Sequence, residues 1–336
     1  MTIIFVLSGV LITQIFSYKW FLDDMDEEGQ ATAGMSKCQL ATCHVFCMGV
    51  FLRYYFLLKQ GFQEVWKKTS SSTAEEMRER NHKLFCMATD LSMLKLFETF
   101  LESVPQLLLQ LYIILRHPEL SVNQYLSLAF SFASVAWALV DYRRCLRKSL
   151  PSIREMPSGA PTAVYLLYKL CTITSHVLSY SLLLTLSPYS AVALTVLWLL
   201  GTTWAHLLQT NFCSSRGLEL LYRAVIGVIL VFTFFNVKGQ DTKVAMIIYY
   251  IFYSVINFTT PPLLFLLKPE LQSSKLLLTV GGLIFGGSVL GLLCLVLYYL
   301  FLHPRGNWPE ADEVDGLGNE AETTRKIRKV ENFLQP

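Results

Sequence analysis

Charged side chains are scarce in this sequence of 336 residues, of which 16% are Asp, Glu, Lys or Arg and 53% are hydrophobic. A soluble domain carries charge on about a quarter of its residues. The charges of this chain collect between long apolar blocks. This composition excludes a soluble globular enzyme, a disordered chain, a nucleic-acid-binding protein and a small secreted module. It indicates a polytopic helical membrane protein.

Catalytic motifs are also absent. The sequence contains no P-loop, no G-x-S-x-G turn, no H-E-x-x-H pair and no Gly-rich dinucleotide turn. The six histidines are scattered singly, and the eight cysteines lie mostly inside apolar runs or beside basic loops. Such cysteines indicate reduced thiols, and neither a disulfide framework nor a zinc site. We therefore predict a protein that is not an enzyme and that needs no cofactor or metal.

Apolar runs dominate what is present. They fall near residues 2–18, 40–58, 84–115, 121–140, 161–184, 188–208, 219–236, 244–267 and 276–302. Most reach the roughly 20 residues that cross a bilayer core, and in lipid they must be helical because an open strand leaves its backbone groups unsatisfied. We predict an all-α transmembrane domain over residues 1–302, with about eight or nine hydrophobic helices, and a flexible cytosolic tail over residues 303–336.

The run 84–115 is too long for one straight span. Pro105 lies in its middle, where a proline removes a backbone hydrogen bond, so a kinked helix and a partly inserted pair of helices are both compatible with it. Basic side chains place the loops 59–83 and 143–154 on the cytoplasmic side. Nine alternating spans would then leave the tail outside. We therefore expect that one run re-enters the membrane without crossing it, or that a segment is miscounted.

Charges inside the apolar runs are the first candidate functional residues. On a helix Lys95, Glu98, Glu102 and Gln106 share one stripe of roughly 80°, and Asp90 lies beside it. Carboxylates at bilayer depth are costly unless they are paired or hydrated, and so they mark function. The alternative is an internally paired Lys95–Glu98 cluster that only fixes helix packing. One lysine cannot neutralise three carboxylates, and partners must come from water or from other helices.

Other apolar runs offer such partners. They are Arg53, Lys169 and His176, and the pair Asp141 and Arg144 at the end of the fourth run. Opposite charges that are spread over several helices predict a hydrated polar track through or beside the bundle. Such a track suits either a lipid headgroup or a small solute.

The C-terminal tail carries the sharpest motif. Its residues are Asp312, Glu313, Val314, Asp315 and Gly316. The motif resembles the preferred recognition sequence of executioner caspases, with cleavage after Asp315. The alternative is an acidic solvated tail in which these five residues follow one another by chance. It is weaker because the match is complete, is followed by glycine and lies in a segment of low apolar content, where proteases cut.

The spacing of apolar and basic side chains in residues 324–336 predicts a short basic amphipathic helix, with Ile327, Val330 and Leu334 on one face. This inhibitory segment is expected to dock on the cytoplasmic face of the bundle. The alternative is that it lies on the anionic membrane surface.

Four segments resemble the XK-related family of membrane proteins. They are residues 89–110 (TDLSMLKLFETFLESVPQLLLQ), 137–142 (WALVDY), 234–240 (FFNVKGQ) and 314–316 (VDG). The resemblance covers nearly the whole chain. It implies a multi-pass phospholipid scramblase of the plasma membrane. The protein would be silent until an executioner caspase removes the tail, and would then expose phosphatidylserine on dying cells for engulfment.

The resemblance also implies roles for single residues. It assigns the intramembrane acidic positions of the family to Asp90, Glu98, Glu102 and Asp141, and it places His176 where one branch has a basic residue. The expected lipid path then comprises Asp90, Lys95, Glu98, Glu102, Asp141, Arg144 and His176. The family pattern further implies an acidic membrane helix upstream of the run that starts here at Met1, which this sequence is expected to lack.

Three functions follow from these observations. The first is a scramblase whose polar groove lets headgroups cross, with phospholipids including phosphatidylserine and an executioner caspase as partners. The second is a transporter or channel that uses the same charges for a small solute. The third is a membrane subunit that supports a partner protein, and the resemblance allows for a single-span membrane partner. A transporter more often shows inverted repeats with broken helices, and the sequence shows no such repeat.

Overall fold

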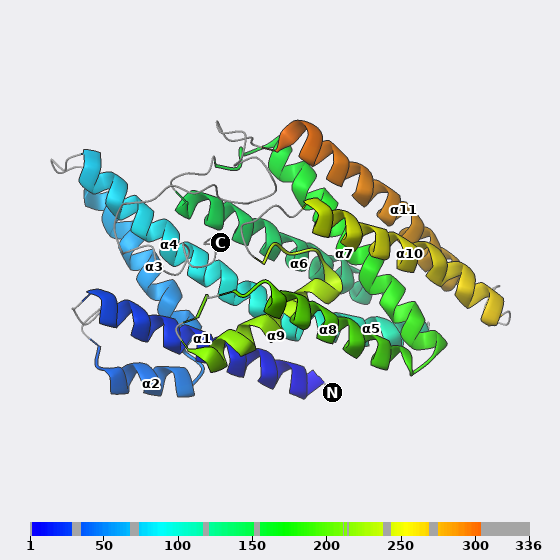
Figure 1. The fold of residues 1–336 in the computed structure, drawn as a ribbon, viewed down its shortest axis with the longest axis horizontal. Helices are drawn as coiled ribbons and strands as arrows, with labels where there is room; N and C mark the ends of the chain where they lie inside the picture. The colour runs from blue at the N-terminus through cyan, green and yellow to red at the C-terminus, as the bar shows by residue number, and fades with distance from the viewer. Residues whose placement is uncertain are drawn as a thin grey trace.

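The structure is a computed structural model that describes residues 2–28, 35–67, 74–116, 121–150, 155–210, 212–213, 215–237, 243–268 and 275–303. These ranges fold into helices and contain no strand, which confirms the predicted all-α class. In Figure 1, α1 to α4 gather on one side of the bundle, while α10 and α11 pack with α7 on the other.

The helices follow the predicted runs closely in most places. They are α1 (Thr2–Glu28), α2 (Lys37–Val45), α3 (Gly49–Lys67), α4 (Ala74–Glu98), the π-helix η2 (Thr99–Ser103), α5 (Val104–Arg116), α6 (Val122–Ser149), α7 (Ala160–Leu186), α8 (Ser190–Leu207), α9 (Arg216–Phe232), α10 (Lys243–Leu267), α11 (Lys275–Leu297) and the π-helix η4 (Tyr298–Leu302).

Five helices of the described chain are long and apolar enough to cross a membrane by themselves. They are α1, α6, α8, α10, and α11 with η4. The 27 residues of α7 match the length, but this helix buries a series of polar side chains that includes Lys169 and His176. Polar groups facing the inside of a bundle are typical of helices that other helices surround. The described structure is thus that of a multi-pass helical membrane protein.

The predicted run 40–58 is not one helix. It breaks between Val45 and Gly49, where Cys47 takes a positive φ of 60°. The Gln14 side chain of α1 stabilises the break: its Nε2 donates to the Cys47 carbonyl at 3.2 Å, and its Oε1 accepts from the Gly49 N–H at 3.1 Å. The nine residues of α2 span about 14 Å, too short to cross a bilayer, so the prediction of one span over this run is wrong.

The run 84–115 forms one continuous helical segment. Its middle is the π-helix η2, which closes when the Val104 N–H donates to the carbonyl of Thr99, five residues earlier. Pro105 follows as the second residue of α5. A π-helical turn places the proline where the missing donor is tolerated. The structure therefore has a modified single helix here and not a pair of separate helices.

Helix α7 is the centre of the second half of the bundle and packs against α5, α6, α10 and α11. Its contact with α11 is close because Gly287 and Gly291 meet it without side chains. A Cβ atom at Gly287 would lie 2.5 Å from Ser175 Oγ, and one at Gly291 would lie 2.8 Å from Thr172 Cγ2. Small residues at such positions let helix backbones approach within the membrane.

Candidate functional site

Arg53 on α3 is the central charge of a polar cluster between α1, α3 and α4. Its side chain is only 6% exposed. Its Nη1 lies 3.4 Å from Asp90 Oδ2 of α4, and its Nη2 lies 3.9 Å from Asp24 Oδ2 of α1. The Nε and Nη2 atoms also donate to the hydroxyl and the carbonyl of Ser17, each at 3.1 Å. The structure thus supplies the partner from another helix that Asp90 was predicted to need.

The polar cluster continues from Ser17 to His44 on α2. His44 Nδ1 lies 2.8 Å from the Leu40 carbonyl, and its Nε2 lies 3.0 Å from Ser17 Oγ. A carbonyl oxygen only accepts, and we therefore assign the proton to Nδ1. In the neutral ring Nε2 then accepts from the Ser17 hydroxyl, which itself accepts from Arg53. One hydrogen-bonded chain thus runs from α2 through α1 to α3 and α4.

Lys95 lies apart from this cluster. Its side chain is exposed, and its ammonium lies 5.0 Å from the centre of the Tyr54 ring. Among the described residues no carboxylate comes within ion-pair distance of it, whereas the packing alternative required a Lys95–Glu98 pair. That pair does not form in the described structure.

Glu98 and Glu102 of the predicted stripe lie beside and inside the π-helix η2. Both are half-buried, and the π-helix η2 begins directly after Glu98 and contains Glu102. The Cβ of Glu102 lies where Gly9 of α1 leaves room, 3.0 Å from a Cβ built on that glycine. The wider π-helical turn shifts the side chains after it, so the uniform spacing of the predicted stripe does not hold throughout. A carboxylate nevertheless sits at the α1 contact.

Asp141 and Arg144 are half-buried on α6, which packs along α4. Cys145, one turn beyond Asp141, lies near Ser92 of α4. This contact brings the Asp141 end of α6 beside the helix that carries Asp90. The predicted acidic positions Asp90 and Asp141 therefore lie on two helices that pack against each other.

His176 belongs to a different polar cluster. It is buried on α7, with Nδ1 3.1 Å from Asn257 Oδ1 of α10, and the Asn257 Nδ2 donates to Ser288 Oγ of α11 at 3.0 Å. The rings of Tyr180 and Tyr253 lie 4.4 and 5.0 Å from its ring. Its partners come from α10 and α11, whereas those of Arg53 come from α1 and α4. The structure thus does not bring all the predicted path residues together.

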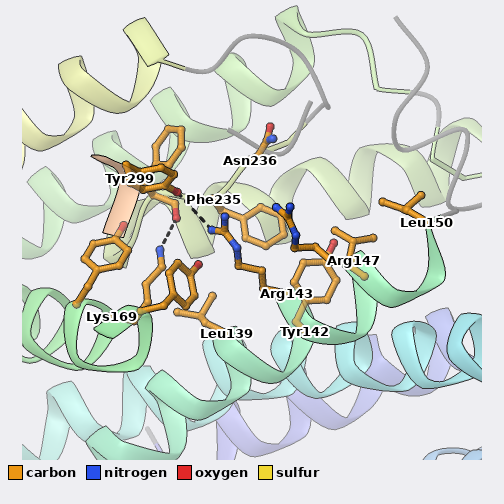
Figure 2. A pocket seen from close by; sticks show the side chains of 13 residues that line it. Leu139, Tyr142, Arg143, Arg147, Leu150, Lys169, Phe235, Asn236 and Tyr299 are labelled. Atoms are coloured by element: carbon orange, nitrogen blue, oxygen red, sulfur yellow. Dashed lines mark hydrogen bonds between the residues drawn. The ribbon is translucent and has the colours of Figure 1, made fainter. Parts of the chain in front are cut away.

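A pocket opens between the C-terminal half of α6, the first half of α7, the segment after α9 and η4 (Figure 2). Three buried cations line it: Arg143 and Arg147 from α6 and Lys169 from α7. Sequence reasoning treated the two arginines as residues of a basic loop. The signal for their role was their spacing of four residues, which puts both on one face of a helix if the helix continues past the apolar run.

The caspase motif and the predicted inhibitory segment lie in residues 304–336, outside the described residues. In the described part of the chain, no group of three or more His, Cys, Asp or Glu side chains is arranged to hold a metal ion. The described candidate sites are therefore the charged clusters and the basic pocket.

Comparison with known proteins identifies the family of this chain. The model of one protein family, XK-related protein, matches residues 1–304. The chain is 56% identical to XK-related protein 9 of Tetraodon nigroviridis over 342 aligned positions, which cover 100% of this chain and 89% of the relative. It is also 34% identical to XK-related protein 8 of the same fish, over 92% of this chain and 75% of the relative. XK-related protein 8 of Pan troglodytes is again 34% identical, over 90% and 75%. A match of this extent shows that the chain belongs to the XK-related protein family.

Proposed function

We propose that this chain is a phospholipid scramblase of the plasma membrane that a caspase activates, and that it exposes phosphatidylserine on dying cells. The observation that carries the proposal is the polar cluster around the buried Arg53, whose carboxylate partners Asp90 and Asp24 come from two neighbouring helices of an apolar bundle. Ionised groups at this depth are costly and are retained where polar species pass or where a switch is held.

The chemistry of scrambling needs no bond to form or break. A phospholipid headgroup carries a phosphate and, in many lipids, an amine, so a path must offer both positive and negative contacts while the acyl chains stay in lipid. Arg53, Asp24, Asp90 and Glu102 supply both signs along α1, α3, α4 and η2. This mechanism agrees with a chain in which no nucleophile motif is found.

The tail supplies the proposed control. Residues 324–336 would dock on the cytoplasmic face and favour a closed arrangement, and cleavage after Asp315 would release them. Tethering makes docking intramolecular at an effective concentration on the order of mM, so weak contacts suffice. The released peptide dilutes away. Before cleavage, the tethered segment shifts the equilibrium between the closed and open states only by its difference in affinity for the two.

The test is reconstitution of the purified full chain in liposomes that contain a fluorescent phospholipid, with a membrane-impermeant quencher added outside. We expect about half of the label to be quenched without caspase, as in empty liposomes, and nearly all after caspase treatment. Asp315→Ala is the matched control, because it should stay silent with caspase. Loss of label protection in the absence of caspase, or no change in the wild-type protein after complete cleavage, contradicts the proposal.

A truncation after Asp315 separates tail inhibition from other steps. If docking alone holds the closed state, the truncated chain scrambles without caspase. A truncated protein that reaches the cell surface and stays silent shows that a further step, such as assembly with a single-span partner, is required.

A further inference from the structure

The last turn of α8 meets α9 through a contact between two basic side chains. His206, the second-last residue of α8, is exposed, and its Nδ1 lies 2.7 Å from Arg223 Nη1 of α9. A guanidinium has donors but no acceptor, so the imidazole nitrogen that faces it must accept the hydrogen bond. Either ring nitrogen can accept only when it carries no proton. The contact therefore exists only while His206 is neutral, with its proton on the other nitrogen.

Arg223 is held in this position by its other bonds. Its side chain is 12% exposed. Its Nε donates to Thr210 Oγ1 at 3.1 Å and to Glu219 Oε1 at 3.3 Å, and its Nη2 donates to the Thr210 carbonyl. Glu219 in turn accepts from the Thr210 hydroxyl and, at 2.7 Å, from the Cys213 N–H. Because these bonds fix the guanidinium, loss of the contact moves His206 and not Arg223.

The charged groups around His206 determine its response to acid. Arg223 and Glu219 of α9 are the charged side chains at this contact, and Glu219 binds Nε of the guanidinium and not Nη1. His206 has no other polar, ionic or ring contact with a described residue, including those of α7, which also packs on α8. Histidine changes charge between about pH 8 and 5. A second proton on the ring removes the acceptor and places two positive charges side by side.

The contact lies at the loosely attached end of α8. Closer to its middle, α8 is packed tightly on α9: a Cβ built on Gly227 would lie 2.2 Å from Thr202 Oγ1, and the Trp198 indole N–H donates to the Ala224 carbonyl at 3.0 Å. Within residues 203–207 the bond to His206 is the one polar side-chain link to α9 among the described residues. Its loss therefore frees the last turn of α8 and the corner that follows, while the middle of the helix stays in place.

The segment that follows α8 also contacts α1. Phe212 stacks on Tyr222 of α9, with ring centres 4.8 Å apart, and lies edge-on to Trp20 of α1 at 5.6 Å. The Arg53 guanidinium lies 5.9 Å from the centre of the Trp20 ring. A change in the corner after α8 thus reaches the polar cluster around Arg53 through two aromatic rings.

We propose that His206 and Arg223 form a proton-sensitive contact: neutral His206 holds the last turn of α8 and the corner at residues 208–210 on α9, and protonated His206 releases them. The hydrogen bond is present at neutral pH, and it is lost as the pH falls and the ring gains its second proton. The proposal does not depend on lipid scrambling, because the release is measured directly on the backbone.

The test is hydrogen–deuterium exchange of the purified full chain in detergent at pH 7.5 and at pH 5.5, with each rate divided by the intrinsic exchange rate at that pH. In peptides from residues 203–219 the corrected exchange should rise by about fivefold at the lower pH, the size expected for loss of one partly exposed charged contact. Peptides from the centre of α7 should change by less than about twofold, because their backbone bonds do not depend on this contact.

Three variants isolate the contribution of His206. The amide oxygen of His206→Gln can accept from Arg223 at both pH values, so the rise should fall below about twofold. His206→Phe has no acceptor and should show the fast exchange already at pH 7.5. His82→Gln on α4 is the matched control, since His82 lies 3.7 Å from the Cys86 thiol and not beside a guanidinium, and it should keep the fivefold rise. Thermal unfolding of each variant checks that it is folded.

Three results overturn the proposal. Unchanged exchange in the wild-type chain shows that the ring turns away from Arg223 without loosening the corner. An equal rise in His206→Gln assigns the effect of pH to another group. A rise of the same size in the α7 peptides shows general loosening of the bundle in acid. A rise confined to residues 203–219 that His206→Gln removes and His82→Gln keeps supports the proposed contact.

Discussion

Replacing Asp90 with asparagine removes the closer of the two carboxylates at Arg53 and keeps the shape of the side chain. At 3.4 Å, Coulomb's law with an effective dielectric constant of about 20 gives roughly 5 kcal/mol of attraction between the two groups. Part of this attraction is offset because burying the ions costs solvation. Removing one partner of a buried pair typically costs about 3–5 kcal/mol, since the remaining charge stays buried.

The structure places Asp90→Asn at the lower end of that range. Arg53 keeps Asp24 at 3.9 Å and its two bonds to Ser17. The side chain of Asp24 is 37% exposed, however, and solvent screens its attraction more strongly than that of Asp90, which is 16% exposed. We therefore expect a loss of about 3 kcal/mol, which lowers the unfolding temperature by about 6 °C for a chain of this size.

The assay is thermal unfolding of the purified protein in one detergent. All variants are heated at one scan rate, because the midpoint of irreversible unfolding depends on that rate. Lys95→Met is the control on the same helix, since Lys95 is exposed, and it should change stability by less than about 0.5 kcal/mol. Arg53→Met combined with Asp90→Leu should lose less than the two single changes together, with a coupling of about 1–3 kcal/mol. Strict additivity, or an Asp90→Asn midpoint equal to that of Lys95→Met, would refute the assigned pairing.

Three further predictions concern other parts of the chain. Executioner caspase should cut after Asp315, and intact-mass measurement should show loss of residues 316–336, whereas an Asp315→Ala protein still cut at that place removes the assignment. The double variant Glu98→Gln and Glu102→Gln should show reduced lipid movement or surface expression, because both carboxylates are half-buried in the apolar bundle; normal values for both in a cell assay contradict this role. Gly49→Ala should destabilise the protein by about 1–3 kcal/mol, because its Cβ would lie 2.1 Å from the His44 ring, while Gly217→Ala, with open space around it, should be close to neutral in the same melting assay.

The sequence predicts helix positions well where a run is uniformly apolar. Residues 161–184 became α7 and residues 244–267 became α10, each with ends shifted by only a few residues. Hydrophobic length decides these elements because the membrane leaves no alternative backbone structure. The end of α6 was less accessible to this reasoning, since Arg143 and Arg147 continue the helix on a polar segment that packs against α7 and η4.

Contacts between distant residues explain the failures. The break at Cys47 depends on Gln14, and nothing in residues 40–58 alone requires it. The sequence predicts only that the partner of Asp90 comes from water or from another helix. That this partner is Arg53 and no other cation depends on how α3 packs against α4. The π-helix η2 likewise shifts Glu102 away from the ideal helical spacing.

The corner between α2 and α3 has a consequence for the order of assembly. One amide, that of Gln14, satisfies a carbonyl and an N–H on the two sides of the break, and it lies 33 and 35 residues earlier in the chain. During synthesis α1 therefore leaves the ribosome before the segment that needs it. The α2–α3 corner completes its hydrogen bonds only by docking on a helix that is already in the membrane. The corner between α2 and α3 is thus expected to be complete only after these helices have docked on α1.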